Sequence, residues 1–315
     1  MEINDVCVLG GTGFVGQSLA EHLCERGARV RVVTRGLPRS RSLWVLPTLE
    51  VVIADPQDEV ALAAQFEGMD AVINLCGILH ETSRQTFESV HVDLPRKAVG
   101  ACRAAGVRHF VHMSALGASE TGPSAYLRSK GRGEAAVREA AAGLPVTIVR
   151  PSVIFGEEDD FLNKIAGLLR IFPVLPLAVA DARFQPVWVE DVARVMATLL
   201  GDSQAFGQSY ELCGPKVYRF REIVELVARE MGVRRAIVAL PGWAGELQAF
   251  ALEHLPGKMM TRDNLRSLSV DNVCDSPFPA LFGFQPASVE AIAPEYLAGS
   301  NPRARYNLFR YRAGR

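Results

Sequence analysis

The feature that most constrains this chain is a glycine-rich turn near its N-terminus, between an apolar strand and an amphipathic helix. The strand Val6–Leu9 is followed by Gly10, Gly13 and Gly16, and the helix Phe14–Arg26 begins within the same segment. In this spacing Gly10 permits a tight turn, Gly13 lets the backbone approach a pyrophosphate, and Gly16 packs the helix close to the strand. The N–H groups and positive dipole end of the helix then face the phosphates. The segment predicts a dinucleotide site, with an ordinary tight turn as the alternative.

Apolar segments alternate with helical patterns through the first half of the chain, and this alternation predicts the fold class. The expected strands are Val6–Leu9, Arg29–Thr34, Val51–Ala54, Ala71–Cys76, His109–Ser114 and Val146–Arg150, and the expected helices include Phe14–Arg26, Arg84–Ala105 and Tyr126–Ala142. Continuously apolar strands separated by helices form a parallel sheet covered on both faces, with right-handed crossovers. We therefore expect an α/β protein with a doubly wound parallel Rossmann sheet.

Beyond Pro151 the alternation weakens, and proline and glycine become frequent, which predicts a second, smaller region. A dinucleotide-binding Rossmann domain is expected over 1–156, and 187–213 returns to it as strand and helix. A cap or substrate region is expected over 157–186 and 214–299, and a basic tail over 300–315.

Composition and charge limit the function classes. The 315 residues are 49% hydrophobic and 22% charged with a net charge of −1, which indicates a globular protein and disfavours a nucleic-acid binder. No stretch approaches the ~20 apolar residues of a membrane span, and no signal peptide is apparent. Six cysteines occur without a CxxC pair. They indicate reduced, buried thiols in a cytoplasmic protein, so neither a metal site nor a disulfide is expected.

Two segments of the second half bear on partners. Phe161–Phe172 predicts an amphipathic helix, and the apolar run after it suits a lipid-like or quinone-like substrate, a membrane-facing partner, or core packing. The tail Arg303–Arg315 interleaves five arginines with aromatic residues. A solvated chain end is one interpretation; a docking segment for an anionic membrane surface or a membrane-complex partner is the other. The second would place a cytoplasmic protein at the periphery of the inner membrane.

The residues after the second strand bear on the choice of nucleotide. A carboxylate there favours NAD, whereas an arginine accommodates the 2′-phosphate of NADP. This chain has Arg35, then Arg39 and Arg41, and no acid between Ala28 and Leu49. Because a guanidinium binds phosphate through two N–H groups, NADP(H) is favoured over NAD(H), with a solvated basic loop as the alternative.

Further motifs follow in a fixed order. They are Ala54-Asp55, Asn74–Gly77, Tyr126 with Lys130, Arg150–Gly156, Gln185–Ala193 and Tyr210–Pro215. Together with the glycine turn they resemble the short-chain dehydrogenase/reductase superfamily in its extended form. The segments His91-Val-Asp, His112–Ala118 and Leu168–Pro176 more closely resemble the atypical group that contains the dehydrogenase-like accessory subunit of respiratory complex I and its bacterial relatives.

The resemblance implies a set of nucleotide-binding positions. They are Gly10, Thr12, Gly13, Phe14, Val15, Gly16, Arg35, Asp55, Cys76, Gly77, Tyr126, Lys130 and Pro151. By the resemblance Asp55 lies beside the adenine, Asn74–Gly77 support the sheet edge at the cofactor, and Tyr126 and Lys130 lie near the nicotinamide. From the residues alone, Asp55 could equally end a strand and Asn74 could cap a turn.

The resemblance also implies a catalytic set that is incomplete here. In active members Tyr126 would be the general acid/base, and the Lys130 ammonium would lower the phenol pKa and bind ribose. The hydroxyl that holds the substrate carbonyl falls on Ala115 rather than Ser114, and the supporting asparagine is replaced by His91. Ser114 is the candidate hydroxyl if the strand ends before it, because neighbouring strand residues point to opposite faces.

Two function classes therefore stay open. One is an NADP(H)-binding protein whose nucleotide is structural, with an accessory or assembly role in a respiratory or quinone-related membrane system, and the resemblance favours it. The alternative is an active NADP-dependent reductase, dehydrogenase or epimerase that uses Tyr126 and Lys130 on an apolar carbonyl or sugar-like substrate. This alternative needs a hydroxyl from Ser114 or from Thr121 or Ser124 in the next loop.

Overall fold

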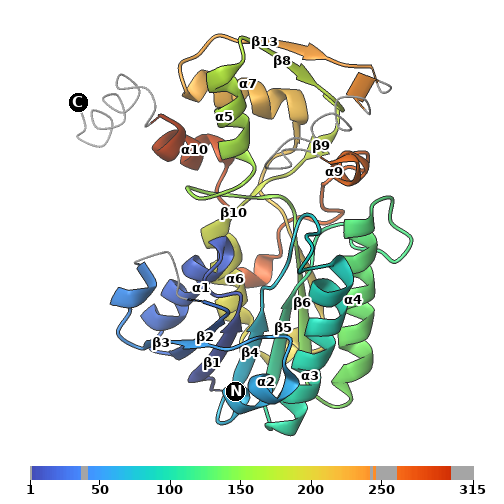
Figure 1. The fold of residues 1–315 in the computed structure, drawn as a ribbon. Coiled ribbons are helices and arrows are strands. Elements are labelled where there is room, and N and C mark those ends of the chain that lie inside the picture. Colours follow the sequence, from blue (N-terminus) through green and yellow to red (C-terminus); the bar gives the residue numbers. More distant parts are fainter. Residues whose placement is uncertain (1, 37–41, 242–243, 246–260, 299–315) are drawn as a thin grey trace, which may run out of the picture. The chain divides into compact units, whose positions relative to one another are not determined.

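The computed structural model describes residues 2–36, 42–241, 244–245 and 261–298 (Figure 1). The chain divides into two compact units. Unit 1 comprises Met1–Pro151, Val189–Leu212 and Pro279–Phe282, and unit 2 comprises Ser152–Trp188, Cys213–Phe278 and Gly283–Arg315. The predicted tail over 300–315 and the arginines at 39 and 41 lie outside the described residues.

Unit 1 is built on a seven-stranded, all-parallel sheet with strand order β11-β6-β5-β4-β1-β2-β3. Its strands are β1 (Asp5–Leu9), β2 (Arg29–Thr34), β3 (Leu49–Ile53), β4 (Ala71–Asn74), β5 (His109–Met113), β6 (Val146–Pro151) and β11 (Ser209–Leu212). The chain winds outward from β1 to β3, returns, and winds the other way from β4 to β6. The doubly wound parallel sheet predicted from the sequence is therefore confirmed.

Helices cover both faces of this sheet (Figure 1). They are α1 (Phe14–Glu25), α2 (Glu59–Phe66), the π-helix Glu88–Asp93, α3 (Leu94–Ala104), α4 (Ala125–Ala141) and α6 (Val189–Leu199), with short 3-10 turns at Ser42–Val45, Ser203–Ala205 and Ala280–Phe282. The helices α2, α3 and α4 pack side by side, and α1 packs on α6. Between α2–α4 and the sheet lies a core that includes Phe66, Val99 and Phe110.

Two elements differ from the sequence prediction. The helix expected from Arg84 begins instead at the π-helix Glu88–Asp93, which runs directly into α3. The strand expected at Val187 does not return to the large sheet, because β10 (Val187–Trp188) pairs with β7 (Ile154–Phe155) inside unit 2. Only α6 and β11 of the predicted returning segment belong to unit 1.

Unit 2 is a helical core closed by short two-stranded ribbons. Its helices are α5 (Leu162–Ile171), α7 (Phe220–Glu230), α9 (Arg262–Ser267) and α10 (Val289–Leu297). Besides β7–β10, the ribbons are β8 (Val174–Leu177) with β13 (Ala236–Ala239), and β9 (Arg183–Phe184) with β12 (Tyr218–Arg219). Side chains of α5, α7 and α10 form one buried apolar cluster. In the described part of the chain no helix is long and apolar enough to cross a membrane.

The prediction that no cysteine forms a disulfide is wrong. Cys213 and Cys274 of unit 2 are bonded across a separation of 61 residues. The side-chain amide of Gln185 brings the two segments together, since its Nε2 donates to the carbonyl of Gly214 and its Oε1 accepts the N–H of Cys274. Such long-range pairing leaves no spacing signal in the sequence. The other four cysteines are free thiols, as predicted.

Candidate functional site

The glycine turn has the geometry that its spacing predicts. Gly10 follows β1 with a φ of +78°, a conformation in which a side chain is strained. A Cβ on Gly16 would lie 2.5 Å from the carbonyl oxygen of Gly10, so α1 can approach the turn this closely only with glycine there. Gly13 is exposed, and a Cβ built on it would lie 3.3 Å from the Gly10 carbonyl oxygen, with no other described atom within 4 Å outside its neighbours along the chain. The turn is therefore tightly packed at Gly10 and Gly16 and accessible to solvent at Gly13.

The N-terminus of α1 is arranged for an anion. Gly13 is its N-cap, no side chain caps the helix, and the first turn contains no acidic residue. Backbone N–H groups at a helix start without a carboxylate nearby attract phosphate through hydrogen bonds and the helix dipole. The predicted residues Thr12 and Phe14 are partly buried beside Gly13, whereas Val15 is buried against the fold.

The segment after β4 lies against the glycine turn. A Cβ on Gly10 would be 3.2 Å from the backbone nitrogen of Cys76, and the N–H of Leu75 donates to the carbonyl of Leu9. The Asn74 side chain caps this turn, because its Oδ1 accepts the N–H of Cys76 at 3.1 Å. Burial raises the pKa of the Cys76 thiol to about 11, so it stays protonated.

Arg35 and Asp55, which follow β2 and β3, were both predicted to bind the nucleotide, but their side chains make different contacts. Arg35 is exposed, and its charge acts on the Cys76 thiol, so it lies on the same edge of the sheet. With the Gln85 amide turned so that its oxygen faces Arg35, Nη1 of Arg35 donates to it at 2.9 Å. Asp55 instead accepts the N–H of Gln57 at 3.0 Å, which is the strand-ending role considered for it.

Lys130 of α4 reaches the same edge. Its Nζ donates to the carbonyl of Met113 at the end of β5, 3.2 Å away, and would lie 3.3 Å from a Cβ on Gly77. Burial lowers the pKa of the Lys130 ammonium to about 8. The structure thus brings Gly10, Cys76, Gly77 and Lys130 together at the carboxyl ends of β1, β4 and β5.

His91, which the resemblance predicts in the place of an asparagine, is fixed in one tautomer. Its Nε2 accepts the backbone N–H of Ile78 at 3.0 Å, so the ring proton is on Nδ1. That Nδ1–H donates to Ser129 Oγ at 2.8 Å, and the Ser129 hydroxyl donates to the carbonyl of Tyr126. Burial and the Lys130 charge lower the pKa of His91 to about 2. The ring is therefore neutral and anchors the N-terminus of α4.

Tyr126 packs its ring into an aromatic cluster. It meets Phe87 and His91 edge-on, with ring centroids 6.1 and 5.6 Å apart. Burial raises the pKa of the Tyr126 phenol to about 12. Desolvation alone accounts for this direction, and a lowering of the phenol pKa by Lys130 stays a prediction.

Two polar atoms at the end of β5 are buried without a hydrogen-bond partner among the described residues. They are Ser114 Oγ and His112 Nε2. Asn74 Nδ2 donates to His112 Nδ1, which leaves the His112 proton on Nε2. β5 ends at Met113, so Ser114 lies directly beyond the strand, which is the condition under which it is the candidate hydroxyl; its N–H donates to the Val149 carbonyl. The sequence did not predict that His112 would present a buried N–H at Nε2, because the tautomer and the burial of a histidine depend on the folded structure.

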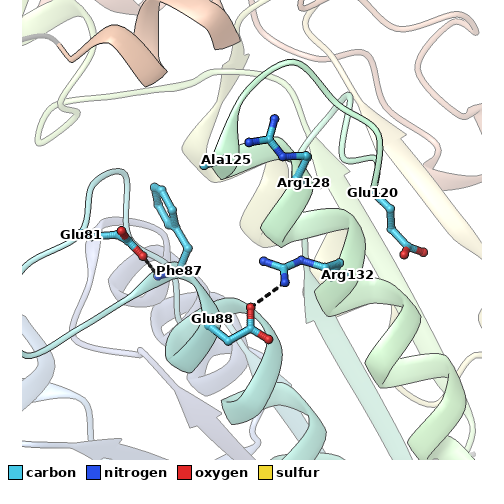
Figure 2. Close-up of a pocket in the computed structure, with 7 residues that line it drawn as sticks. All are labelled: Glu81, Phe87, Glu88, Glu120, Ala125, Arg128 and Arg132. Carbon is cyan, nitrogen blue, oxygen red and sulfur yellow. Dashed lines mark hydrogen bonds and ion pairs between the residues drawn. The ribbon is translucent and has the colours of Figure 1, made fainter.

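A pocket of about 450 Å³ lies between the N-terminal part of α4 and the segment around Phe87 and Glu88 (Figure 2). Its lining residues are Glu81, Phe87, Glu88, Glu120, Ala125, Arg128 and Arg132. An Arg132–Glu88 ion pair of 2.8 Å crosses it. Phe87 is shared with the aromatic cluster around Tyr126, but no predicted cofactor-binding residue lines the pocket.

The residues present fit a nicotinamide dinucleotide. The open side of Gly13 and the uncapped start of α1 suit a pyrophosphate, Arg35 offers a guanidinium at the end of β2, and Lys130 supplies a cation beside Gly77. Pro151, the last predicted cofactor residue, ends β6 and accepts the N–H of Leu116. A parallel sheet with this turn defines a dinucleotide-binding Rossmann protein.

The chain belongs to the NAD(P)H-binding family, whose model matches residues 10–203. A solved NADPH-dependent quinone oxidoreductase from Escherichia coli, in complex with NADPH, superposes with a TM-score of 0.73 at 20% identity and covers 96% of this chain and 99% of its own. That likeness concerns the fold.

Two kinds of protein are among the curated relatives. Subunit 9 of the NADH dehydrogenase [ubiquinone] 1 alpha subcomplex is 37% identical in Arabidopsis thaliana, over 70% of this chain and 56% of that protein. The Mus musculus protein of the same name is 32% identical over 92% of this chain and 78% of its own length. A ceramide reductase from Caulobacter vibrioides is 33% identical over 78% of this chain and 76% of its own.

Proposed function

We propose that this chain binds NADP(H) in the glycine turn and keeps it as a structural component, in an accessory role beside a membrane-bound respiratory complex. The observation that carries the proposal is the packing of Tyr126, whose ring lies edge-on against Phe87 and His91. Desolvation in this cluster raises the pKa of the phenol, which moves it away from the working range of a general acid/base.

His91 supports the same conclusion. A proton relay needs a group that can accept and release protons, and both ring nitrogens of His91 are occupied by fixed hydrogen bonds. With a pKa of about 2 the ring stays neutral across the physiological range. The cluster therefore holds α4 beside the nucleotide site and does not provide a path for protons.

The accessory role draws on the relatives named as subunits of NADH dehydrogenase. A subunit that carries a tightly held nucleotide gains stability by mass action: at 100 times the dissociation constant the gain is about 2.7 kcal/mol. Such a nucleotide stabilises the surface that the partner recognises without being consumed.

Preference for NADP(H) rests on Arg35. Loss of one charge-assisted phosphate contact costs about 1.5–3 kcal/mol, roughly a tenfold to hundredfold change in affinity. We expect Arg35→Asp to weaken NADPH binding by that factor and to leave NADH binding nearly unchanged, measured by fluorescence titration. The matched control is Arg84→Asp, an exposed arginine of the same unit. Equal affinity of the wild type for both nucleotides would contradict the preference.

Two variants separate a structural nucleotide from a reacting one. Gly13→Val places a side chain where the pyrophosphate is expected, so it should release nucleotide and remove the rise in melting temperature that NADPH gives. Tyr126→Phe should leave nucleotide binding and this rise nearly unchanged. A Gly13→Val protein that keeps its nucleotide would refute the assigned site.

A reductase is the second candidate, and one observation favours it. Ser114 Oγ is buried without a partner in the described structure, as expected of a hydroxyl reserved for a substrate carbonyl. The named ceramide reductase makes an apolar ketone a reasonable probe. Stopped-flow oxidation of bound NADPH by a long-chain ketone should be absent if the nucleotide is structural. Rapid hydride transfer that falls ~10²–10⁴-fold in Tyr126→Phe would establish the reductase instead.

A further inference from the structure

The β8–β13 ribbon of unit 2 presents an apolar face to solvent. The parallel register pairs Val174 with Ala236 and Pro176 with Val238, so these four side chains share one face. All four are exposed. The alternate residues Leu175 and Leu177 are buried in the core formed with α5 and α7. The inner face therefore packs on the core mainly through β8, with Ile237 half-buried, and the other face is apolar and exposed.

The apolar surface continues into the end of α5. The N–H of Ala236 donates to the carbonyl of Pro173 at 3.1 Å, which places the helix end at the edge of the ribbon. Ile171 and Phe172 at this end are 72% and 47% exposed, and Val174 and Val238 are 49% and 48% exposed. We call this surface the β8–β13 face; it comprises Ile171, Phe172, Val174, Pro176, Ala236 and Val238. Contiguous aliphatic and aromatic side chains at such exposure mark an interaction surface.

Three arginines adjoin the β8–β13 face along the described chain. Arg170 and Arg234 are exposed and form no ion pair within the described residues. Arg235 directs its Nε to the carbonyl of Leu169 at the end of α5, so its charge also has no carboxylate partner. The sequence has no acidic residue over 165–180 or 231–245. An apolar surface bordered by unpaired arginines complements a layer with an apolar interior and an anionic surface.

We propose that the β8–β13 face docks on an anionic lipid bilayer. Phe172, Ile171 and the valines would enter the boundary between headgroups and acyl chains, while the arginines would contact lipid phosphates. A second copy fits poorly, because a two-fold contact would bring the same arginine borders against each other. A protein partner fits less well too, because the six residues of the face include neither tyrosine nor tryptophan, which anchor many such interfaces.

The test is flotation of the full-length protein with vesicles of phosphatidylcholine, with and without 30% phosphatidylglycerol. Wild type should float with the anionic vesicles and lose binding as salt rises. Phe172→Glu and Val174→Glu should each weaken binding about tenfold or more, because each removes buried apolar area and adds repulsion. The Arg170→Ala/Arg234→Ala variant should lose about fivefold per arginine, and only on anionic vesicles.

Matched controls lie in unit 1. Val60→Glu changes an 80% exposed valine and Arg84→Ala an exposed arginine, and both should bind like wild type. Urea unfolding followed by circular dichroism shows for every variant that both units are folded, and this readout does not depend on lipid or on nucleotide. Unchanged flotation of Phe172→Glu would overturn the proposal, as would binding lost only on deletion of 303–315. A dimer of the wild type that Phe172→Glu dissociates, without vesicle binding, would assign the face to a second copy instead.

Discussion

A single methyl group at position 133 should test how the candidate site is assembled. Gly133 of α4 faces the backbone of the π-helix, and a Cβ there would overlap the carbonyl oxygen of His91 and lie 3.1 Å from its carbonyl carbon. Both partners are backbone, so no side chain can rotate away, and α4 or the π-helix has to move by about 1 Å.

The magnitude follows from two opposing effects. Overpacking against an unyielding neighbour costs up to about 3 kcal/mol, and the higher helix propensity of alanine returns about 1 kcal/mol. Gly133→Ala should therefore lower the free energy of unfolding by about 2 kcal/mol, or the melting temperature by roughly 4–8 °C. Gly100→Ala is the matched control, since a Cβ on this helical glycine of α3 meets no atom within 4 Å; it should stabilise by about 1 kcal/mol.

The assay is urea unfolding of both variants, together with NADPH titration. Because His91 and Lys130 lie on the two elements that Gly133→Ala separates, this variant should also bind NADPH more weakly, whereas Gly100→Ala should not. If Gly133→Ala is as stable as Gly100→Ala, the close approach of α4 to the π-helix does not hold the site, and the reasoning fails.

Three further results are expected. His22 Nε2 and Glu190 Oε2 lie 3.0 Å apart, and this contact raises the pKa of His22 and lowers the pKa of Glu190. The pair should stabilise the fold between the two pKa values and weaken as pH rises through the raised pKa of His22 or falls through the lowered pKa of Glu190. Urea midpoints measured across pH should show this dependence in the wild type and not in Glu190→Gln. Arg150→Met should cost about 3 kcal/mol by leaving the buried Glu134 carboxylate unpaired, and adding Glu134→Leu should recover most of it in the same unfolding assay. Alkylation of unfolded, unreduced protein should modify four thiols, and reduction should expose six and lower stability by about 2–4 kcal/mol; six thiols before reduction would contradict the disulfide.

Local patterns predicted most of unit 1. The strand, glycine turn and helix around Gly10 are fixed by neighbouring residues, so spacing alone identifies them. Unit 2 was harder, because its strands are two to four residues long and pair across distant segments. The pairing of β10 with β7 and the bond between Cys213 and Cys274 depend on contacts that no local period encodes.

The candidate site divides in the same way. The positions of Lys130 and Gly77 followed from motif order, and the structure brings them together. The protonation states of the site residues could not be predicted from the motifs, because the pKa of Tyr126 depends on how deeply its phenol is buried. The tautomer of His91 likewise depends on Ile78 and Ser129, which approach it only in the folded chain.

The chain order of unit 1 has a consequence for synthesis. Its sheet is completed by β11, which pairs with β6 only after the first segment of unit 2, Ser152–Trp188, has left the ribosome. Until then β6 is an edge strand with unpaired backbone groups, a template for aggregation. A fragment that stops at Pro151 would hold that state permanently. Nascent chains paused there are thus the natural clients of a chaperone, and the shortest useful expression fragment of unit 1 has to include β11.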